Sequence, residues 1–141
     1  MSAPGDAAAV RAIVAGHGDF AVGMISAVDQ ITGRGAAFVA LSNRGLGPEE
    51  IDARLRALLA ETGAHAVFTD LPAGSVTIAA RRAAREIKGL VVVTGTNLAT
   101  LLDFAFDGGL PDEEAAEHAC DKGRRSIAVH APTPRETPGG D

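Results

Sequence analysis

The sequence lacks tryptophan and tyrosine, and among its 141 residues it has five phenylalanines and a single cysteine, Cys120. One thiol cannot close an internal disulfide, which is typical of proteins from reducing compartments. With so few aromatic rings, the core must be built from small side chains in closely packed elements. This composition favours a compact α/β or all-α fold over a sandwich anchored by aromatic residues.

Long hydrophobic stretches are also missing. No apolar run approaches the roughly 20 residues that a membrane-spanning helix needs. The first nine residues lack the basic start and continuous apolar stretch of a signal peptide. The length suits one domain. The sequence therefore predicts a single cytoplasmic domain that does not insert into a membrane.

Positive charge is in deficit. The chain has 13 Lys and Arg against 18 Asp and Glu, for a formal net charge of −5. Such a balance argues against a protein that binds nucleic acid non-specifically or reads an anionic membrane surface through a basic patch. We therefore expect no nucleic-acid partner.

An alternation of strand, turn and helix dominates what is present. Residues 10–15 are apolar except for Arg11, and the glycine-rich turn Gly16-His17-Gly18-Asp19 leads into a helix that ends near Gly33, with Asp19 placed to cap it. The pattern then repeats: strands are predicted at 36–41, 66–69 and 90–94, and helices at 48–61, at 75–87, from 97 and at 111–120.

Strands that alternate with helices of this length form right-handed βαβ units and a parallel sheet with helices on both faces. We therefore expect a doubly wound α/β domain whose four-stranded sheet has the order 2-1-3-4. A further strand at 126–130 would lie at the C-terminal edge. The domain is predicted to span residues 10–131, between a flexible start (1–9) and a disordered Pro/Gly-rich tail (132–141).

Two polar side chains follow neighbouring strands of this predicted sheet. In doubly wound folds, ligands bind outside the carboxyl ends of the strands, where the winding direction reverses. With strand 1 beside strand 3, that crevice lies between the loop that holds His17 and the loop that holds Asp70. Topology alone therefore predicts that these two residues face each other.

The chemistry of such a pair is definite. A carboxylate that accepts a hydrogen bond from one imidazole nitrogen leaves the other nitrogen free, and it stabilises the charge that the ring gains on forming a bond. Gly74 and Ser75 follow at a helix N-terminus, where backbone N–H groups and a hydroxyl attract an anion. Together, His17, Asp70 and Ser75 suit phosphoryl transfer through histidine, with Gly74 and Ser75 binding phosphate.

Simpler interpretations remain open for each residue. A histidine between two glycines is often only a turn residue, and Asp70 or Ser75 could serve only to cap a helix. The Gly16-His17-Gly18 run lacks the GxGxxG spacing of a dinucleotide site. Cys120, with His118 and Asp121 near it, lacks the ligand spacing of a structural zinc site, so no metal is expected.

Three short segments resemble the IIA components of the mannose/fructose/sorbose class of the bacterial phosphoenolpyruvate-dependent sugar phosphotransferase system (PTS). They are residues 12–18 (AIVAGHG), residues 69–75 (TDLPAGS) and residues 95–98 (GTNL). Their order and spacing are more specific than any one of them. The similarity runs from about Val10 to Val129, although Ala73 stands where the family usually has glycine.

This resemblance implies the roles of the site residues. His17 would be phosphorylated on Nε2 by the phosphocarrier protein HPr and would pass the phosphoryl group to a IIB component. Asp70 would orient the ring and Ser75 would donate to the phosphoryl oxygens, with no metal, nucleotide or other cofactor. Family members are often homodimers in which a C-terminal strand, here 126–130, joins the sheet of the partner.

Two other functions stay open beside the phosphohistidine carrier. Because no IIB domain is attached in this sequence, the protein could be a regulatory module whose His17 phosphorylation state controls a partner without sugar transport. A flavodoxin-like cofactor binder is a third hypothesis, although no Trp or Tyr is present to stack on a flavin.

Overall fold

A single parallel sheet forms the centre of the molecule. The computed structural model describes residues 9–132, so the predicted flexible start and Pro/Gly-rich tail lie almost wholly outside it. All pairings between strands are parallel and the order is β2-β1-β3-β4, which confirms the predicted topology. The strands are β1 (Ala12–Gly16), β2 (Phe38–Ser42), β3 (Ala66–Thr69) and β4 (Val91–Val93).

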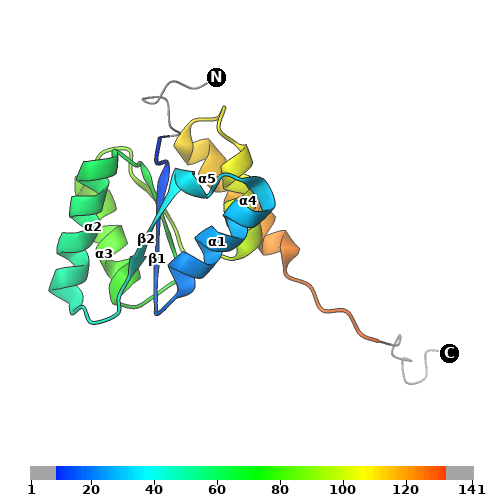
Figure 1. The fold of residues 1–141 in the computed structure, drawn as a ribbon, viewed down its shortest axis with the longest axis horizontal. Helices are drawn as coiled ribbons and strands as arrows, with labels where there is room; N and C mark the ends of the chain where they lie inside the picture. The colour runs from blue at the N-terminus through cyan, green and yellow to red at the C-terminus, as the bar shows by residue number, and fades with distance from the viewer. Residues whose placement is uncertain (1–8, 133–141) are drawn as a thin grey trace.

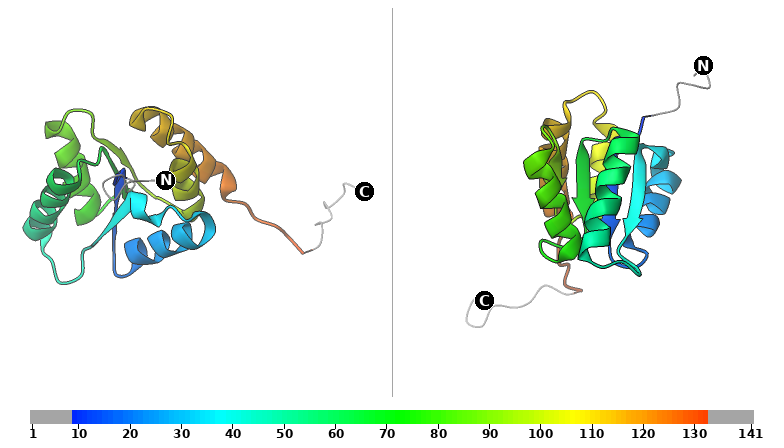
Figure 2. Two further views of the ribbon diagram at one scale, coloured as in Figure 1. Left: turned by 45° about the horizontal axis from the view of Figure 1, so that its top comes forward. Right: turned by 90° about the vertical axis from the view of Figure 1, so that its left-hand side faces the viewer.

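Helices cover both faces of the sheet. α2 and α3 lie on one face, and α1, α4 and α5 lie on the other (Figures 1 and 2). This three-layer arrangement confirms the predicted α/β class. The helices are α1 (Phe20–Thr32), α2 (Pro48–Thr62), α3 (Ser75–Glu86), α4 (Leu98–Phe106) and α5 (Asp112–Ser126), and a 3₁₀ turn, η2 (Gly35–Ala37), precedes β2.

Adjacent residues of the inner strands supply two separate cores. Val14 and Phe68 belong to the core under α1, α4 and α5, whereas Ile13 and Val67 belong to the core under α2 and α3. Successive side chains of a strand point to opposite faces, so both sets are needed to hold two helical layers. β1 is buried along its whole length, and its carboxyl end is therefore a fixed support for the loop that follows.

The C-terminal strand predicted at 126–130 is not part of this sheet. Ser126 is the last residue of α5, and residues 127–130 are extended, exposed and unpaired. They lead away from the body of the protein (Figure 1). The Asn97 side chain donates a hydrogen bond to Gly123 O (3.0 Å), which connects the last turn of α5 to the start of α4. Exchange of this segment between two chains stays a prediction.

Candidate functional site

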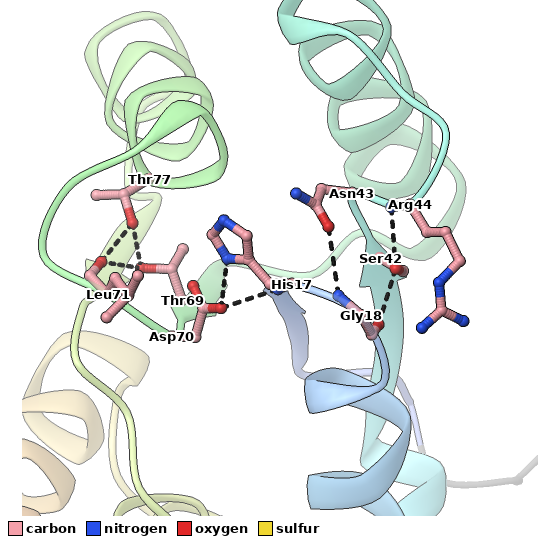
Figure 3. A network of polar contacts seen from close by, with 9 residues as sticks. All are labelled: His17, Gly18, Ser42, Asn43, Arg44, Thr69, Asp70, Leu71 and Thr77. Carbon is pink, nitrogen blue, oxygen red and sulfur yellow. Dashed lines mark hydrogen bonds and ion pairs between the residues drawn. The ribbon is translucent and has the colours of Figure 1, made fainter.

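His17 and Asp70 meet at the carboxyl edge of the sheet. They follow β1 and β3, which are parallel neighbours, so both strands end at the same place. Oδ2 of Asp70 accepts hydrogen bonds from the backbone N–H of His17 (2.8 Å) and from its ring nitrogen Nδ1 (2.8 Å), as Figure 3 shows. The structure thus brings together the two residues that topology predicted to face each other.

The electrostatics of this contact determine which ring nitrogen is available. Burial of the Asp70 carboxyl by itself would raise its pKa, but the hydrogen bonds from the His17 backbone and ring and the charge of that ring outweigh burial, so the pKa lies below its usual value. Asp70 is therefore an anion at neutral pH, and Nδ1 carries a proton toward it. The His17 side chain is 51% exposed, against 11% for Asp70, which leaves Nε2 open to a reactant.

Gly16 makes this approach possible. A Cβ atom at that position would lie 2.8 Å from Asp70 Oδ2 and 2.7 Å from a ring carbon of Phe20. Both distances are shorter than Cβ contacts allow, so a larger residue would push the carboxylate away from His17. Sequence reasoning treated Gly16 only as part of a turn, because nothing in the local sequence indicates which distant side chain comes close to it.

The loop between β2 and α2 holds the other side of the His17 turn. Ser42 Oγ donates to Gly18 O (2.8 Å), and the Gly18 N–H donates to Asn43 Oδ1 (3.3 Å) (Figure 3). The backbone N–H of Asn43 also donates to Gly16 O (3.1 Å). Sequence reasoning missed both residues. The available signal was their position at the carboxyl end of β2, where Ser42 is the last residue of the strand and Asn43 follows it.

Buried threonines fix the loop that carries Asp70. Thr77 Oγ1, on α3, donates to Thr69 Oγ1 (2.7 Å), and Thr69 Oγ1 donates to Leu71 O (3.3 Å). Both threonine side chains are buried. A hydrogen-bonded hydroxyl pair in the core costs little, whereas breaking it would leave a buried polar atom unpaired. The pair connects the start of the Asp70 loop to α3.

Gly74 and Ser75 lie where the sequence predicted, at the N-terminus of α3. Gly74 precedes the helix with φ 101°, a conformation that glycine adopts without strain, and Ser75 is its first residue. Within residues 9–132 no hydrogen bond joins the Ser75 hydroxyl to His17 or Asp70. No residue other than glycine has positive φ in this part of the chain, so Ala73 is not strained. Phosphate binding by Gly74 and Ser75 stays a prediction.

Asp19 does not cap α1 as expected. It precedes the helix but makes no side-chain capping bond. Its carboxylate is instead paired with the guanidinium of Arg44 from the β2–α2 loop, with Nη1 3.1 Å from Oδ1. The tertiary contact with a cation has replaced the local contact with the backbone.

The remaining histidines and the cysteine lie apart from this pair. His65 is 3.7 Å from Asp112, and His118 is 3.7 Å from Asp107 on the α4–α5 side. Across residues 9–132 there is no group of three His, Cys, Asp or Glu side chains that could hold a metal ion. In the same range, no helix is both long and apolar enough to cross a lipid bilayer.

Comparison with known proteins agrees with this geometry. The family described as PTS system fructose IIA component (EIIA-man) matches residues 11–118. Among solved structures, the mannose/sorbose-specific IIA subunit of the phosphotransferase system from Enterococcus faecalis is 25% identical, with 92% of this chain and 99% of that chain covered and a TM-score of 0.76.

Two further structures share the fold. The phosphotransferase system component EIIA from Streptococcus agalactiae is 18% identical, with coverage of 84% and 95% of the two chains and a TM-score of 0.77. The PTS IIA protein associated with the fucose utilization operon from Streptococcus pneumoniae is 22% identical, with coverage of 84% and 91% and a TM-score of 0.70. No curated protein matches the sequence. The match to the family over most of the chain shows that this protein belongs to the IIA components of the mannose/fructose/sorbose class of the sugar phosphotransferase system.

Proposed function

We propose that the protein is a cytoplasmic phosphohistidine carrier that accepts a phosphoryl group from HPr on His17 and passes it to a IIB component. The observation that carries this proposal is the 2.8 Å contact between His17 Nδ1 and Asp70 Oδ2. It engages Nδ1 and leaves Nε2, on an exposed side chain, as the nitrogen available to a reactant. Family membership supports the phosphotransfer role and the class of partner.

The transfer needs no metal and no net proton. The Nε2 lone pair attacks phosphorus, the bond between phosphorus and HPr breaks, and its electron pair stays on HPr. His17 then carries a positive charge, shared over a ring that Asp70 faces with its carboxylate. Transfer to IIB is the same step in reverse, with the electron pair of the broken bond returning to Nε2.

The N-terminus of α3 is the proposed site for the phosphoryl oxygens. Gly74 precedes that helix and Ser75 is its first residue, at the end of the loop that begins with Asp70. Unpaired N–H groups and the positive end of the helix dipole favour an anion there. The Ser75 hydroxyl adds a hydrogen-bond donor. Asp70 would therefore orient the ring, and Ser75 would stabilise the phosphoryl oxygens.

Labelling tests the proposal directly. Incubation with phosphoenolpyruvate, enzyme I and HPr should add one acid-labile phosphate, and His17→Ala should abolish it while His65→Ala should leave it unchanged. His65 is the matched control because its side chain is also exposed and near a carboxylate. Label that persists in His17→Ala would remove the carrier function.

The same preparation separates a carrier from a regulatory module. If the protein is a carrier, addition of a IIB component should transfer the labelled phosphoryl group from His17 to IIB. If the label stays, and the phosphorylated and unphosphorylated forms capture different partners in a pull-down, the protein is instead a regulator controlled by its phosphorylation state.

We also propose that the protein is a homodimer through its C-terminal segment. β4 is an edge strand, paired on one side with β3. A cavity of about 480 Å³ lies beside it, lined by Val92, Gly95, Cys120 and Ile127 among others. The exposed side chains of Ile127 and Val129 follow α5. An unpaired edge next to an extended apolar segment favours strand exchange between two copies.

A further inference from the structure

Arg44 places a guanidinium next to the His17 turn. Its Nη2 packs against Gly18, 3.4 Å from the position that a Cβ of that glycine would occupy. Its Nη1 pairs with Asp19 Oδ1 at 3.1 Å. Gly18 and Asp19 directly follow His17, so the cation contacts the two residues next to the proposed phosphorylation site. Figure 3 shows Arg44 on the α2 side of the His17 turn, with Asp70 on the opposite side.

Arg44 is distinctive among the loops that follow the strands. Four loops follow the four strands, at residues 17–19, 43–47, 70–74 and 94–97, and Arg44 is the only Lys or Arg in them. Arg11 and Arg34 are engaged at the other end of the sheet, where they donate to the carbonyl oxygens of Phe104 and Ala105 at the end of α4. A phosphoryl group on His17 would therefore add negative charge beside Asp70 and Asp19, with one cation in these loops to offset it.

The present partner of Arg44 is easily exchanged. The side chains of Arg44 and Asp19 are 68% and 81% exposed. An ion pair as open to solvent as this one is weak. A phosphoryl group offers more negative charge and several acceptor oxygens, and a guanidinium binds such a group through two parallel hydrogen bonds.

The backbone of Arg44 is held in place while its side chain is free to turn. Its N–H donates to Ser42 Oγ (3.1 Å), and Ser42 Oγ donates to Gly18 O. Asn43 is tied to the same turn through Gly18 N and Gly16 O. The base of the Arg44 side chain thus keeps a fixed relation to the His17 turn, and the exposed guanidinium would approach a new group at the ring by rotation of the side chain.

We propose that Arg44 is a phosphate-binding residue, whose guanidinium leaves Asp19 and binds the phosphoryl oxygens when His17 is phosphorylated at Nε2. This inference rests on the proposed carrier function and adds a second phosphate-binding element to the proposed site, beside Gly74 and Ser75. The phosphoryl group would lie between the N-terminus of α3 and the β2–α2 loop. Arg44 would stabilise the phosphorylated form relative to the free form.

The equilibrium constant for phosphoryl exchange between HPr and this protein tests the inference. This constant depends only on the free concentrations of the two proteins, each in its phosphorylated and unphosphorylated form. A change in the affinity of the two proteins for each other therefore does not alter it. We expect Arg44→Ala to lower the exchange constant about tenfold. Arg44→Lys should lower it less, because lysine keeps the positive charge but cannot form the two parallel hydrogen bonds of a guanidinium. Arg54→Ala is the control, since Arg54 is an exposed arginine on α2 and its loss changes the net charge equally.

A ³¹P NMR titration of the phosphorylated proteins provides a second measurement. A guanidinium on the phosphoryl oxygens favours their doubly ionised form, so the titration midpoint should be higher in Arg44→Ala than in the wild type or Arg54→Ala. An exchange constant and a midpoint equal to those of Arg54→Ala would overturn the role of Arg44 while leaving the carrier function intact. A wild-type protein that takes no phosphate from HPr would overturn both.

Discussion

Gly16 and Asp70 are in contact at a point where no side chain fits between them: a Cβ on Gly16 would lie 2.8 Å from Asp70 Oδ2. The backbone of β1 thus approaches the carboxylate closely enough for Asp70 to bind both the N–H and the ring of the next residue, His17. The site therefore requires glycine at position 16 as well as histidine at position 17.

Replacing this glycine should therefore damage the site and the fold together. We expect Gly16→Ala to destabilise the protein by about 1–3 kcal/mol through overpacking and to slow phosphorylation of His17. Urea unfolding and the labelling rate measure the two effects. Gly23→Ala is the control: Gly23 is exposed on α1 with nothing within 4 Å of a Cβ, so alanine there should stabilise the helix by about 0.5–1 kcal/mol. Equal behaviour of the two variants would contradict the close approach.

Removing the charge of Asp70 should slow transfer without abolishing it. In Asp70→Asn the amide can still touch the ring, but it no longer favours the charged form of His17, so we expect phosphorylation to be at least about tenfold slower. Single-turnover labelling by HPr measures this rate. An unchanged rate would refute the orienting role, and complete loss in a folded variant would mean that the carboxylate does more than orient.

The lowered pKa of Asp70 also predicts a pH dependence of stability. Because the carboxylate is more acidic in the folded protein than in the unfolded chain, its contribution is fully present above the usual Asp pKa and is lost as pH falls through the lowered value. Asp70→Asn lacks this ionisation. We therefore expect the difference in unfolding free energy between wild type and Asp70→Asn to shrink below about pH 4. A difference that stays constant down to pH 2 would contradict the assigned shift.

Asp103 on α4 should have the opposite effect on the pH dependence of stability, because its pKa is shifted in the opposite direction. Burial, together with the charge of Asp107, raises the pKa of Asp103, and its Oδ2 is buried without a hydrogen-bond partner among the described residues. Its ionised form therefore disfavours folding at neutral pH, and protonation relieves this as pH falls. We expect Asp103→Asn to stabilise the protein at pH 7 and to do so less at pH 4, as measured by urea unfolding at both values. No gain at pH 7 would contradict the raised pKa.

Asn97 combines a helix cap with a bond between helices. Its Oδ1 accepts the Thr100 N–H at the start of α4 (3.0 Å), and its Nδ2 donates to Gly123 O on α5 (3.0 Å). Asn97→Ala should cost about 1–2 kcal/mol of unfolding free energy. Asn97→Asp keeps the cap and loses only the donor, so its loss should be smaller. If the two variants lose the same amount, the contact with α5 outweighs the cap.

The proposed dimer makes a prediction about the segment after α5. Ile127→Asp combined with Val129→Asp should convert a dimer to a monomer in analytical ultracentrifugation, because the charges oppose burial against a partner's β4 edge. Ile31→Asp serves as the control, since Ile31 is an exposed apolar residue at the end of α1. A wild-type protein that sediments as a monomer would remove the proposal.

The sequence alone determined the order of elements and, through it, the position of the central pair. Apolar runs separated by amphipathic helices require parallel strands, and parallel neighbours end at one edge, so His17 and Asp70 had to meet if strand 1 lies beside strand 3. This inference needs the local pattern, the handedness of βαβ units and the strand order that is common in doubly wound folds. Asn97 and Gly33 were likewise predictable, because a cap depends on its own helix.

Only the tertiary structure decided which residues complete the site and where the last helix ends. Gly16 matters because the Asp70 carboxylate, from the loop after β3, comes close to it. Asp19 pairs with Arg44 instead of capping its own helix, and α5 continues to Ser126 beside Asn97. Each of these outcomes depends on a contact between segments far apart in the chain. Local propensity carries no information about such a partner, because the energy of the contact exists only once the sheet has brought the two segments together.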